Sequence, residues 1–142
     1  MKQSETLVRV RYKDTDQMGV VYYANYFIWF EVGRTEYMRE MGMSYKDLEH
    51  NELFLPVIEA YCKYKLPARY DDQLKVITRL QFLQEVRIGF QYEILHADTG
   101  QMLVQGETTH AFVNNHGKPV VLRKQNPFLW RIFKDQVLEK DL

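Results

Sequence analysis

The sequence predicts an α+β fold, in which a curved antiparallel sheet of about five strands wraps around one long helix. Its 142 residues are close to the length of one domain, so we expect a single domain over residues 1–142. A proline-free stretch from about Val21 to Met41 carries apolar residues at helical spacing and is apolar almost all round in its first half, as in a buried helix. Beyond it the apolar period changes from 3.6 to 2, which predicts consecutive strands that can pair antiparallel.

Each expected element has a local signal. The alternation over residues 5–12 predicts a first strand, and the polar stretch 13–19 predicts a loop before the long helix. Ser44 and Asp47 have the spacing of a helix cap for residues 44–50. Four alternating or β-branched runs predict strands over 54–66, 74–82, 86–94 and 102–113, and Asn126 followed by Pro127 predicts a last helix to about residue 139.

The charge balance excludes some partners. There are 19 basic and 19 acidic residues, whereas proteins that bind nucleic acid or anionic membranes need surplus cations. No apolar run approaches the ~20 residues that span a bilayer, and the first residues lack the apolar core of a secretory signal. A single cysteine suits a reducing compartment. We therefore expect a soluble cytoplasmic protein with no nucleic-acid or membrane partner.

Several catalytic chemistries lack their residues. The two serines lie outside any G-x-S-x-G motif, and the seven glycines form no phosphate-binding loop. The four histidines show no zinc-site spacing with one another or with the cysteine. A serine hydrolase, a nucleotide-phosphate enzyme and a zinc enzyme are therefore poorly supported.

Two carboxylates precede the start of the apolar helix. Asp14 and Asp16 lie in a loop beside backbone N–H groups that a helix start leaves unpaired, where negative charge is favoured. A carboxylate near such donors, at the mouth of an apolar pocket, can direct water at a carbonyl whose oxygen the donors stabilise. The alternative interpretation is that both aspartates only cap the helix.

The same segment carries a family resemblance. The pattern D-T-D-x-x-G-V-V-Y-Y-x-N-Y, followed by F-E-x-x-R-T-E and by the turn Tyr70-Asp71-Asp72, resembles hotdog-fold acyl-CoA thioesterases of the 4-hydroxybenzoyl-CoA thioesterase type. The resemblance covers nearly the whole chain. It implies hydrolysis of an acyl-CoA thioester to a carboxylic acid and CoA, without a metal or bound cofactor.

The resemblance also implies roles for individual residues. Asp16 matches the catalytic carboxylate, which acts as nucleophile or as general base. Tyr23 matches the helix-start residue whose N–H points at the thioester carbonyl; related proteins often carry histidine there. Substrate-lining positions correspond to Val20, Val21, Asn25, Tyr26 and Phe27.

Two further substrate contacts are implied. Glu31 matches an acid that meets a substrate hydroxyl in the aromatic-substrate branch, although the alternative of an ion pair with Arg34 or Arg69 is slightly favoured. Arg87 matches a phosphate-contacting arginine. Lys63, Lys65 and Arg69 alternate with tyrosines and could hold phosphate, or they could protect a sheet edge against aggregation.

The resemblance implies partners as well. Hotdog subunits pair edge to edge into homodimers and often into homotetramers, with the active site at the interface. An acyl-carrier-protein thioester is an alternative substrate, and a non-catalytic thioester-binding module is an alternative function. A hotdog dehydratase is disfavoured because it needs a histidine where residues 12–49 have none.

Overall fold

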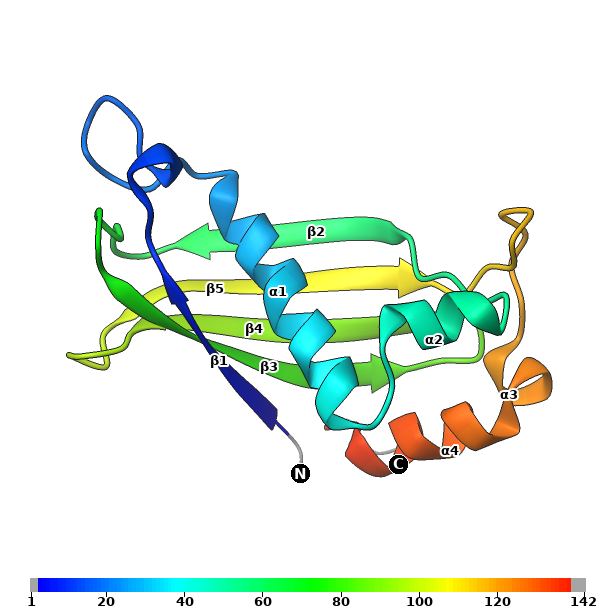
Figure 1. Ribbon diagram of the computed structural model, residues 1–142. Coiled ribbons are helices and arrows are strands. Elements are labelled where there is room, and N and C mark those ends of the chain that lie inside the picture. The colour runs from blue at the N-terminus through cyan, green and yellow to red at the C-terminus, as the bar shows by residue number, and fades with distance from the viewer. Residues whose placement is uncertain (1–2, 139–142) are drawn as a thin grey trace.

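The computed structural model describes residues 3–138 and shows a five-stranded antiparallel sheet with one long helix across a face (Figure 1). The predicted α+β architecture is therefore confirmed. The strands are β1 (Gln3–Arg9), β2 (Val57–Tyr64), β3 (Gln73–Leu83), β4 (Arg87–His96) and β5 (Met102–Ala111). The helices are η1, a 3₁₀ turn (Tyr12–Asp14), α1 (Asn25–Glu40), α2 (Tyr45–His50), α3 (Leu122–Gln125) and α4 (Pro127–Gln136).

The strands do not lie in chain order. The sheet runs β1-β3-β4-β5-β2, so that only β3, β4 and β5 form a continuous meander. β2 crosses over to pair with β5, with Cys62 opposite Gly106. The sheet is open, with β1 at one edge and β2 at the other. The chain between β2 and β3 contains Pro67, whose missing N–H and fixed φ suit a crossover rather than a tight hairpin.

Helix α1 packs on the sheet through aromatic rings. The ring of Phe30 stacks on that of Tyr92 at 4.4 Å with an interplanar angle of 9°, and Tyr37 meets Phe90 edge-on at 5.9 Å. Gly106 of β5 makes room for this packing, because a Cβ there would overlap the ring of Phe30. All four aromatic side chains are buried, and so are Tyr26 and Trp29. Ile28 is 57% exposed, so within one chain the first half of the helix is covered on its sheet side and not all round, as its apolar sequence had predicted.

The start of α1 differs from the sequence prediction. We expected the helix from about Val21, but it begins at Asn25, because Val20 and Val21 are held extended by isolated bridges to Arg69 and Thr15. The caps of α2 and α4 are confirmed: the Ser44 hydroxyl accepts from the Asp47 N–H, and the Asn126 side chain accepts from the Leu129 N–H. α3 was not predicted, and the expected end of the last helix near residue 139 lies outside the described residues.

The edge strand β2 is unusual in its exposure. Seven of its eight residues are exposed, and only Cys62 is partly covered. The other edge strand, β1, alternates between covered and exposed residues and packs against α1. Figure 1 shows β2 running along the upper edge of the sheet, starting near α2 and ending beside the loop that precedes α1. The outer edge of β2, where its backbone could pair with another strand, is therefore uncovered.

Candidate active site

The two aspartates of the loop before α1 have different environments. Asp14 is only 6% exposed, and its carboxylate accepts from the Arg11 N–H at 2.8 Å and forms an ion pair with the Arg11 guanidinium at 3.3 Å. Its carbonyl accepts from the Tyr22 N–H and from the Asn25 side-chain amide, at 2.9 and 2.8 Å. The capping interpretation therefore holds for Asp14, which fastens the loop to the start of the helix.

Asp16 is exposed and lies at a tight turn. Its N–H donates to the Val20 carbonyl at 2.8 Å, and its carbonyl accepts from the N–H of Gly19, which has a φ of +77°. One carboxylate oxygen accepts from the Met18 N–H at 2.8 Å, and the other accepts no hydrogen bond from residues 3–138. Glycine suits position 19 because residues with a side chain rarely adopt that φ. The turn thus presents a solvent-accessible carboxylate directly across from Val20.

Two backbone donors are free at the start of α1. The Tyr22 N–H bonds to Asp14 and the Asn25 N–H bonds to the Tyr22 carbonyl, but within residues 3–138 the N–H groups of Tyr23 and Ala24 donate to no protein acceptor. Adjacent unpaired amides at a helix N-terminus are suited to an oxygen that gains negative charge. The helix start therefore offers the donor pair that an oxyanion hole requires.

A cavity of about 250 Å³ opens beside these amides. The Tyr64 hydroxyl donates to the Tyr23 carbonyl at 3.0 Å, and the Tyr26 hydroxyl accepts from the Ala68 N–H at 3.2 Å. Burial raises the pKa of both phenols, so both stay protonated at neutral pH. The lining residues come from the loop, the helix start and the end of β2: Val20, Val21, Tyr23, Tyr26, Tyr64, Lys65, Leu66 and Pro67.

Four of the nine residues assigned by resemblance to substrate or catalysis line this cavity, namely Val20, Val21, Tyr23 and Tyr26. Asp16 lies across the turn from Val20. Asn25 instead holds the Asp14 carbonyl, and Phe27 packs edge-on against Phe30.

Glu31 and Arg87 lie away from the cavity. Glu31 is exposed on α1, close enough to the Tyr45 phenol to help raise its pKa, and forms no ion pair with Arg34 or Arg69 among the residues described. Arg87 begins β4 at the opposite end of the sheet. The eleven residues of β3 separate it from the loop, roughly 35 Å at strand rise. Within one chain the structure does not bring Arg87 to the cavity.

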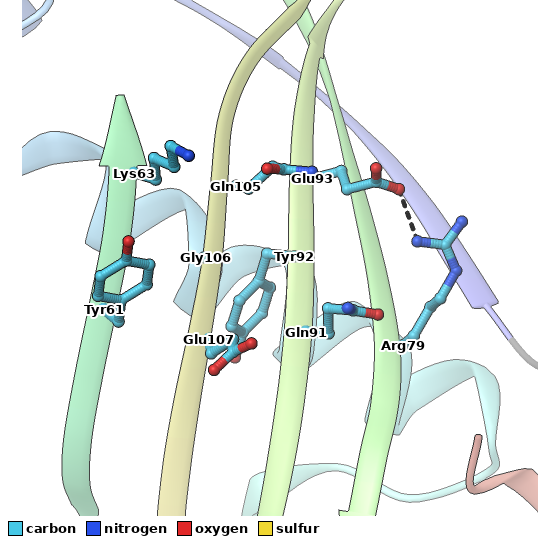
Figure 2. A pocket seen from close by; sticks show the side chains of 9 residues that line it. All are labelled: Tyr61, Lys63, Arg79, Gln91, Tyr92, Glu93, Gln105, Gly106 and Glu107. Carbon is cyan, nitrogen blue, oxygen red and sulfur yellow. Dashed lines mark hydrogen bonds and ion pairs between the residues drawn. The ribbon is translucent and has the colours of Figure 1, made fainter. Parts of the chain in front are cut away.

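The sequence analysis missed Tyr64 as a site residue. It had grouped Tyr64 only with neighbouring cations and tyrosines, and the alternation along an edge strand carries no signal for which residue reaches the helix. The structure divides that cluster: Tyr64 and Lys65 line the cavity, whereas Tyr61 and Lys63 line a separate hollow on the opposite face of the sheet. Figure 2 shows this outer hollow, with polar side chains from four strands and the 2.6 Å ion pair between Arg79 and Glu93.

A buried polar chain crosses the core. His110 contacts the Leu55 carbonyl through Nδ1 at 3.0 Å and the Thr108 hydroxyl through Nε2 at 2.9 Å, and Thr108 contacts the Tyr92 hydroxyl at 2.7 Å. Because a carbonyl only accepts, Nδ1 carries the proton and Nε2 accepts from Thr108. Burial lowers the pKa of His110 to about 4. His110 is therefore a neutral core residue, and it lies outside the cavity.

Arg34 extends this chain toward α2. Burial acts to lower the pKa of its guanidinium, but the neighbouring Tyr92 and Tyr45 phenols outweigh burial and raise it. A second, largely apolar cavity of about 530 Å³ lies next to Tyr45 and is lined in part by Phe54, Leu55 and Pro56. These residues precede β2, so this cavity lies at the opposite end of β2 from Tyr64.

Residues 3–138 contain neither a cluster of metal ligands nor a membrane-spanning helix. No set of three or more histidine, cysteine or acidic side chains is arranged to hold a metal ion. No helix in this part of the chain is long and apolar enough to cross a membrane.

The fold is an antiparallel sheet wrapped on a central helix. Two free amides lie at the start of that helix, and an exposed carboxylate lies on the turn before it. This combination is that of a hotdog-fold thioesterase. Residues 10–133 match the family model of the thioesterase-like superfamily. The chain is 34% identical over 128 residues to YneP of Bacillus subtilis (strain 168), covering 89% of this chain and 92% of that one. The chain belongs to the thioesterase-like superfamily, and it is a thioester hydrolase.

Two other similarities agree with this assignment. The acyl-CoA thioester hydrolase YbgC of Escherichia coli O6:H1 is 35% identical over 91 residues, which cover 64% of this chain and 68% of the relative. The crystal structure of DHNA-CoA thioesterase from Staphylococcus aureus superposes with a TM-score of 0.90 at 32% identity, covering 95% of this chain and 91% of that one.

Proposed function

We propose that this protein hydrolyses acyl-CoA thioesters to a carboxylic acid and CoA, with Asp16 as the catalytic carboxylate. The observation that carries the proposal is the pair of unpaired N–H groups on Tyr23 and Ala24, which lie beside a cavity and next to the turn that presents Asp16. This arrangement supports acyl transfer to water more directly than simple thioester binding, because binding alone needs no exposed carboxylate.

The reaction follows from the chemistry of these groups. The thioester oxygen accepts from the two amides, which stabilise the negative charge that develops when its carbon is attacked. Asp16 either removes a proton from the attacking water or attacks the carbon itself to give an anhydride that water then opens. In both cases the C–S bond breaks, the sulfur leaves as the CoA thiolate and takes up a proton, and water supplies the oxygen of the product acid.

The working unit in this proposal is a homodimer joined through β2. An exposed edge strand favours pairing with another strand, and a two-fold antiparallel pairing places the Tyr64 end of β2 beside the Val57 end of the second copy. The apolar cavity next to Leu55 and Pro56 in one chain would then lie near the Tyr23–Tyr64 cavity of the other. Each site would draw its apolar surface from both chains, and the same pairing would carry Arg87 of the second copy toward the site.

The first experiment measures thiol release from a panel of acyl-CoAs, aliphatic and aromatic, short and long. Wild type is compared with Asp16→Asn, which keeps the shape and removes the charge, and with Asp98→Asn, the same change in the exposed turn between β4 and β5. We expect wild type and Asp98→Asn to turn over at equal rates and Asp16→Asn to lose a factor of about 10² or more.

Each other outcome is informative. Undiminished hydrolysis by Asp16→Asn contradicts the catalytic assignment while leaving the activity in place. Absence of turnover on every acyl-CoA contradicts the CoA substrate, and the same assay with acyl-carrier-protein thioesters then separates a carrier-protein thioesterase from a module that binds without turnover.

A further inference from the structure

Two exposed tyrosines form a pair at the outer end of the loop that carries Asp16. The rings of Tyr12 and Tyr70 lie 5.8 Å apart at an interplanar angle of 76°, and the two residues are 79% and 58% exposed. Aromatic rings normally bury much of their apolar surface, so an exposed ring pair is a candidate surface for a planar partner.

The backbone connects this pair to the cavity. Tyr12 begins η1, whose last residue, Asp14, accepts from the Tyr22 N–H at the helix start. Tyr70 follows Arg69, which pairs with Val20 through an isolated bridge, and Val20 lines the cavity. Two short stretches of chain therefore join the ring pair to the site from both sides.

Uncompensated positive charge lies in the same two segments. Lys13 and Arg69 are exposed, and their side chains make no ion pair with any residue from 3 to 138. The neighbouring Arg9 and Arg11 are different, because their guanidinium groups meet Asp71 and Asp14. The tyrosine pair is thus flanked by two cations that are available to an external anion.

We propose that the Tyr12–Tyr70 pair and the two cations Lys13 and Arg69 bind the nucleotide end of the CoA substrate. This inference rests on the proposed function. Bases stack on exposed aromatic rings, and guanidinium and ammonium groups form charge-assisted hydrogen bonds with phosphate. In this arrangement the long uncharged arm of CoA runs from the nucleotide past Val20, which lines the cavity, to the thioester beside Tyr23.

Of the other cations that the sequence suggested, Lys65 lines the cavity itself, and the remaining two lie away from it. Lys63 and Tyr61 line the hollow on the outer face of the sheet, away from the cavity (Figure 2). Arg87 is at the far end of the sheet and reaches the site only from a second copy. Lys13 and Arg69 need no second chain, so this subsite would exist even in a monomer.

The test uses one acyl group on three carriers: CoA, 3′-dephospho-CoA and pantetheine. The variants are Tyr12→Leu, which removes one exposed ring, and Arg69→Gln and Lys13→Gln, which remove the charges. Lys46→Gln, an exposed cation on α2, is the matched control. KM and kcat are measured for each pair of enzyme and carrier, and the thermal midpoint of every variant checks its fold.

We expect Tyr12→Leu to raise KM about tenfold for both nucleotide carriers and to leave acyl-pantetheine kinetics unchanged. Arg69→Gln and Lys13→Gln should raise KM for acyl-CoA about threefold to tenfold, with a smaller rise where phosphate is missing. Lys46→Gln should behave as wild type.

Equal KM values for acyl-CoA in wild type, Tyr12→Leu and Arg69→Gln would overturn the proposal. A rise that is as large with acyl-pantetheine would also overturn it, because the residues would then act on the acyl or arm end. If Arg87→Gln alone raises KM for acyl-CoA, the nucleotide binds at the other end of the sheet. Failure of the wild type to hydrolyse any of the three carriers instead contradicts the proposed function.

Discussion

The hydroxyl of Tyr64, at the end of β2, donates a 3.0 Å hydrogen bond to the carbonyl of Tyr23, immediately before α1. The Tyr64 ring also meets the rings of Tyr23 and Tyr26 edge-on, at 6.4 and 5.5 Å. The edge strand and the helix start are therefore fixed to each other next to the free amides. The edge strand β2 thus helps to orient the Tyr23 and Ala24 amides that would stabilise the oxyanion.

We expect Tyr64→Phe to lower kcat about twofold to tenfold with little change in KM, because the variant keeps the ring and loses one hydrogen bond. Steady-state kinetics with an acyl-CoA substrate measure the two parameters separately. Tyr61→Phe is the control, since Tyr61 lies on the same strand but faces the outer hollow (Figure 2). An unchanged kcat in Tyr64→Phe would show that the hydroxyl does not position the helix start.

Substituting the two aspartates of the loop should have different effects: loss of the Asp14 charge should lower thermal stability, and loss of the Asp16 charge should lower activity. Asp14→Asn removes the charge of a buried carboxylate that pairs with the exposed Arg11 and weakens a cap, so we expect its Tm to fall by several degrees. Asp16→Asn keeps the oxygen that accepts from Met18 and is exposed, so its Tm should stay within about 1–2 °C of wild type. Calorimetry and thiol-release assays on both variants check the division, and a large loss of Tm in Asp16→Asn would contradict it.

His110 should make folding sensitive to acid. Its ordinary pKa is 6.5 and burial lowers it to about 4, so between these values the unfolded chain binds a proton that the folded chain does not. Stability is therefore fully present above pH 6.5 and is lost as the pH falls toward 4, by about 2–4 kcal/mol in all. His110→Asn, whose amide can still donate to Leu55, should show a flatter pH dependence when denaturant unfolding is measured from pH 7 to 4. An equal dependence in both proteins would exclude His110 as the source.

Gly106→Ala should destabilise the core. The added Cβ would overlap the Phe30 ring and come within 2.9 Å of the Tyr61 carbonyl, so the helix or the strand has to move. We expect a loss of about 1–3 kcal/mol in the free energy of unfolding. Thr109→Ala on the same strand serves as the control for denaturant titration, and a Gly106→Ala protein as stable as wild type would mean that Phe30 can turn aside freely.

If β2 pairs with β2 of a second copy, a charge introduced on this strand should weaken the dimer. Ala60 is exposed near the middle of this strand, and Ala60→Glu would place two like charges near each other across the two-fold axis of the pairing. Light scattering should then show a monomer where wild type shows a dimer, with lower activity. Leu7→Glu, a similarly exposed residue of the opposite edge strand, should leave the mass unchanged. A wild-type monomer that is fully active would contradict the shared site.

Much of the fold was predictable because its signals are local. The caps at Ser44 and Asn126 and the alternation along β3 and β4 depend on residues close together in the chain, and all of them are confirmed. The strand order was not predictable, because the pairing of β2 with β5 depends on contacts between distant segments. The late start of α1 was missed for the same reason, since the bridge from Val20 to Arg69 spans almost fifty residues.

The site was predictable only where its residues are consecutive. The stretch from Asp14 to Tyr26 indicated a carboxylate before a helix start, and the resemblance selected Asp16, but only the structure distinguishes a buried Asp14 from an exposed Asp16. Tyr64 comes from another strand, and nothing in its neighbours indicates that its hydroxyl reaches Tyr23. The assignments of Asp16, Tyr23 and Arg87 remain predictions for the experiments above.

Gly33 in α1 and Gly106 in β5, at the contact between helix and sheet, divide the helix into two parts that differ in how freely their residues can vary. A Cβ on Gly33 would come within 2.8 Å of Val76, and one on Gly106 would overlap Phe30, so the body of the helix lies too close to the sheet to accept larger residues. The residues from Tyr23 to Phe27 precede this close contact, and several face the cavity or solvent. Changes of substrate preference in related sequences should therefore accumulate at the start of the helix and at the ends of β2, while positions 30–33 resist change.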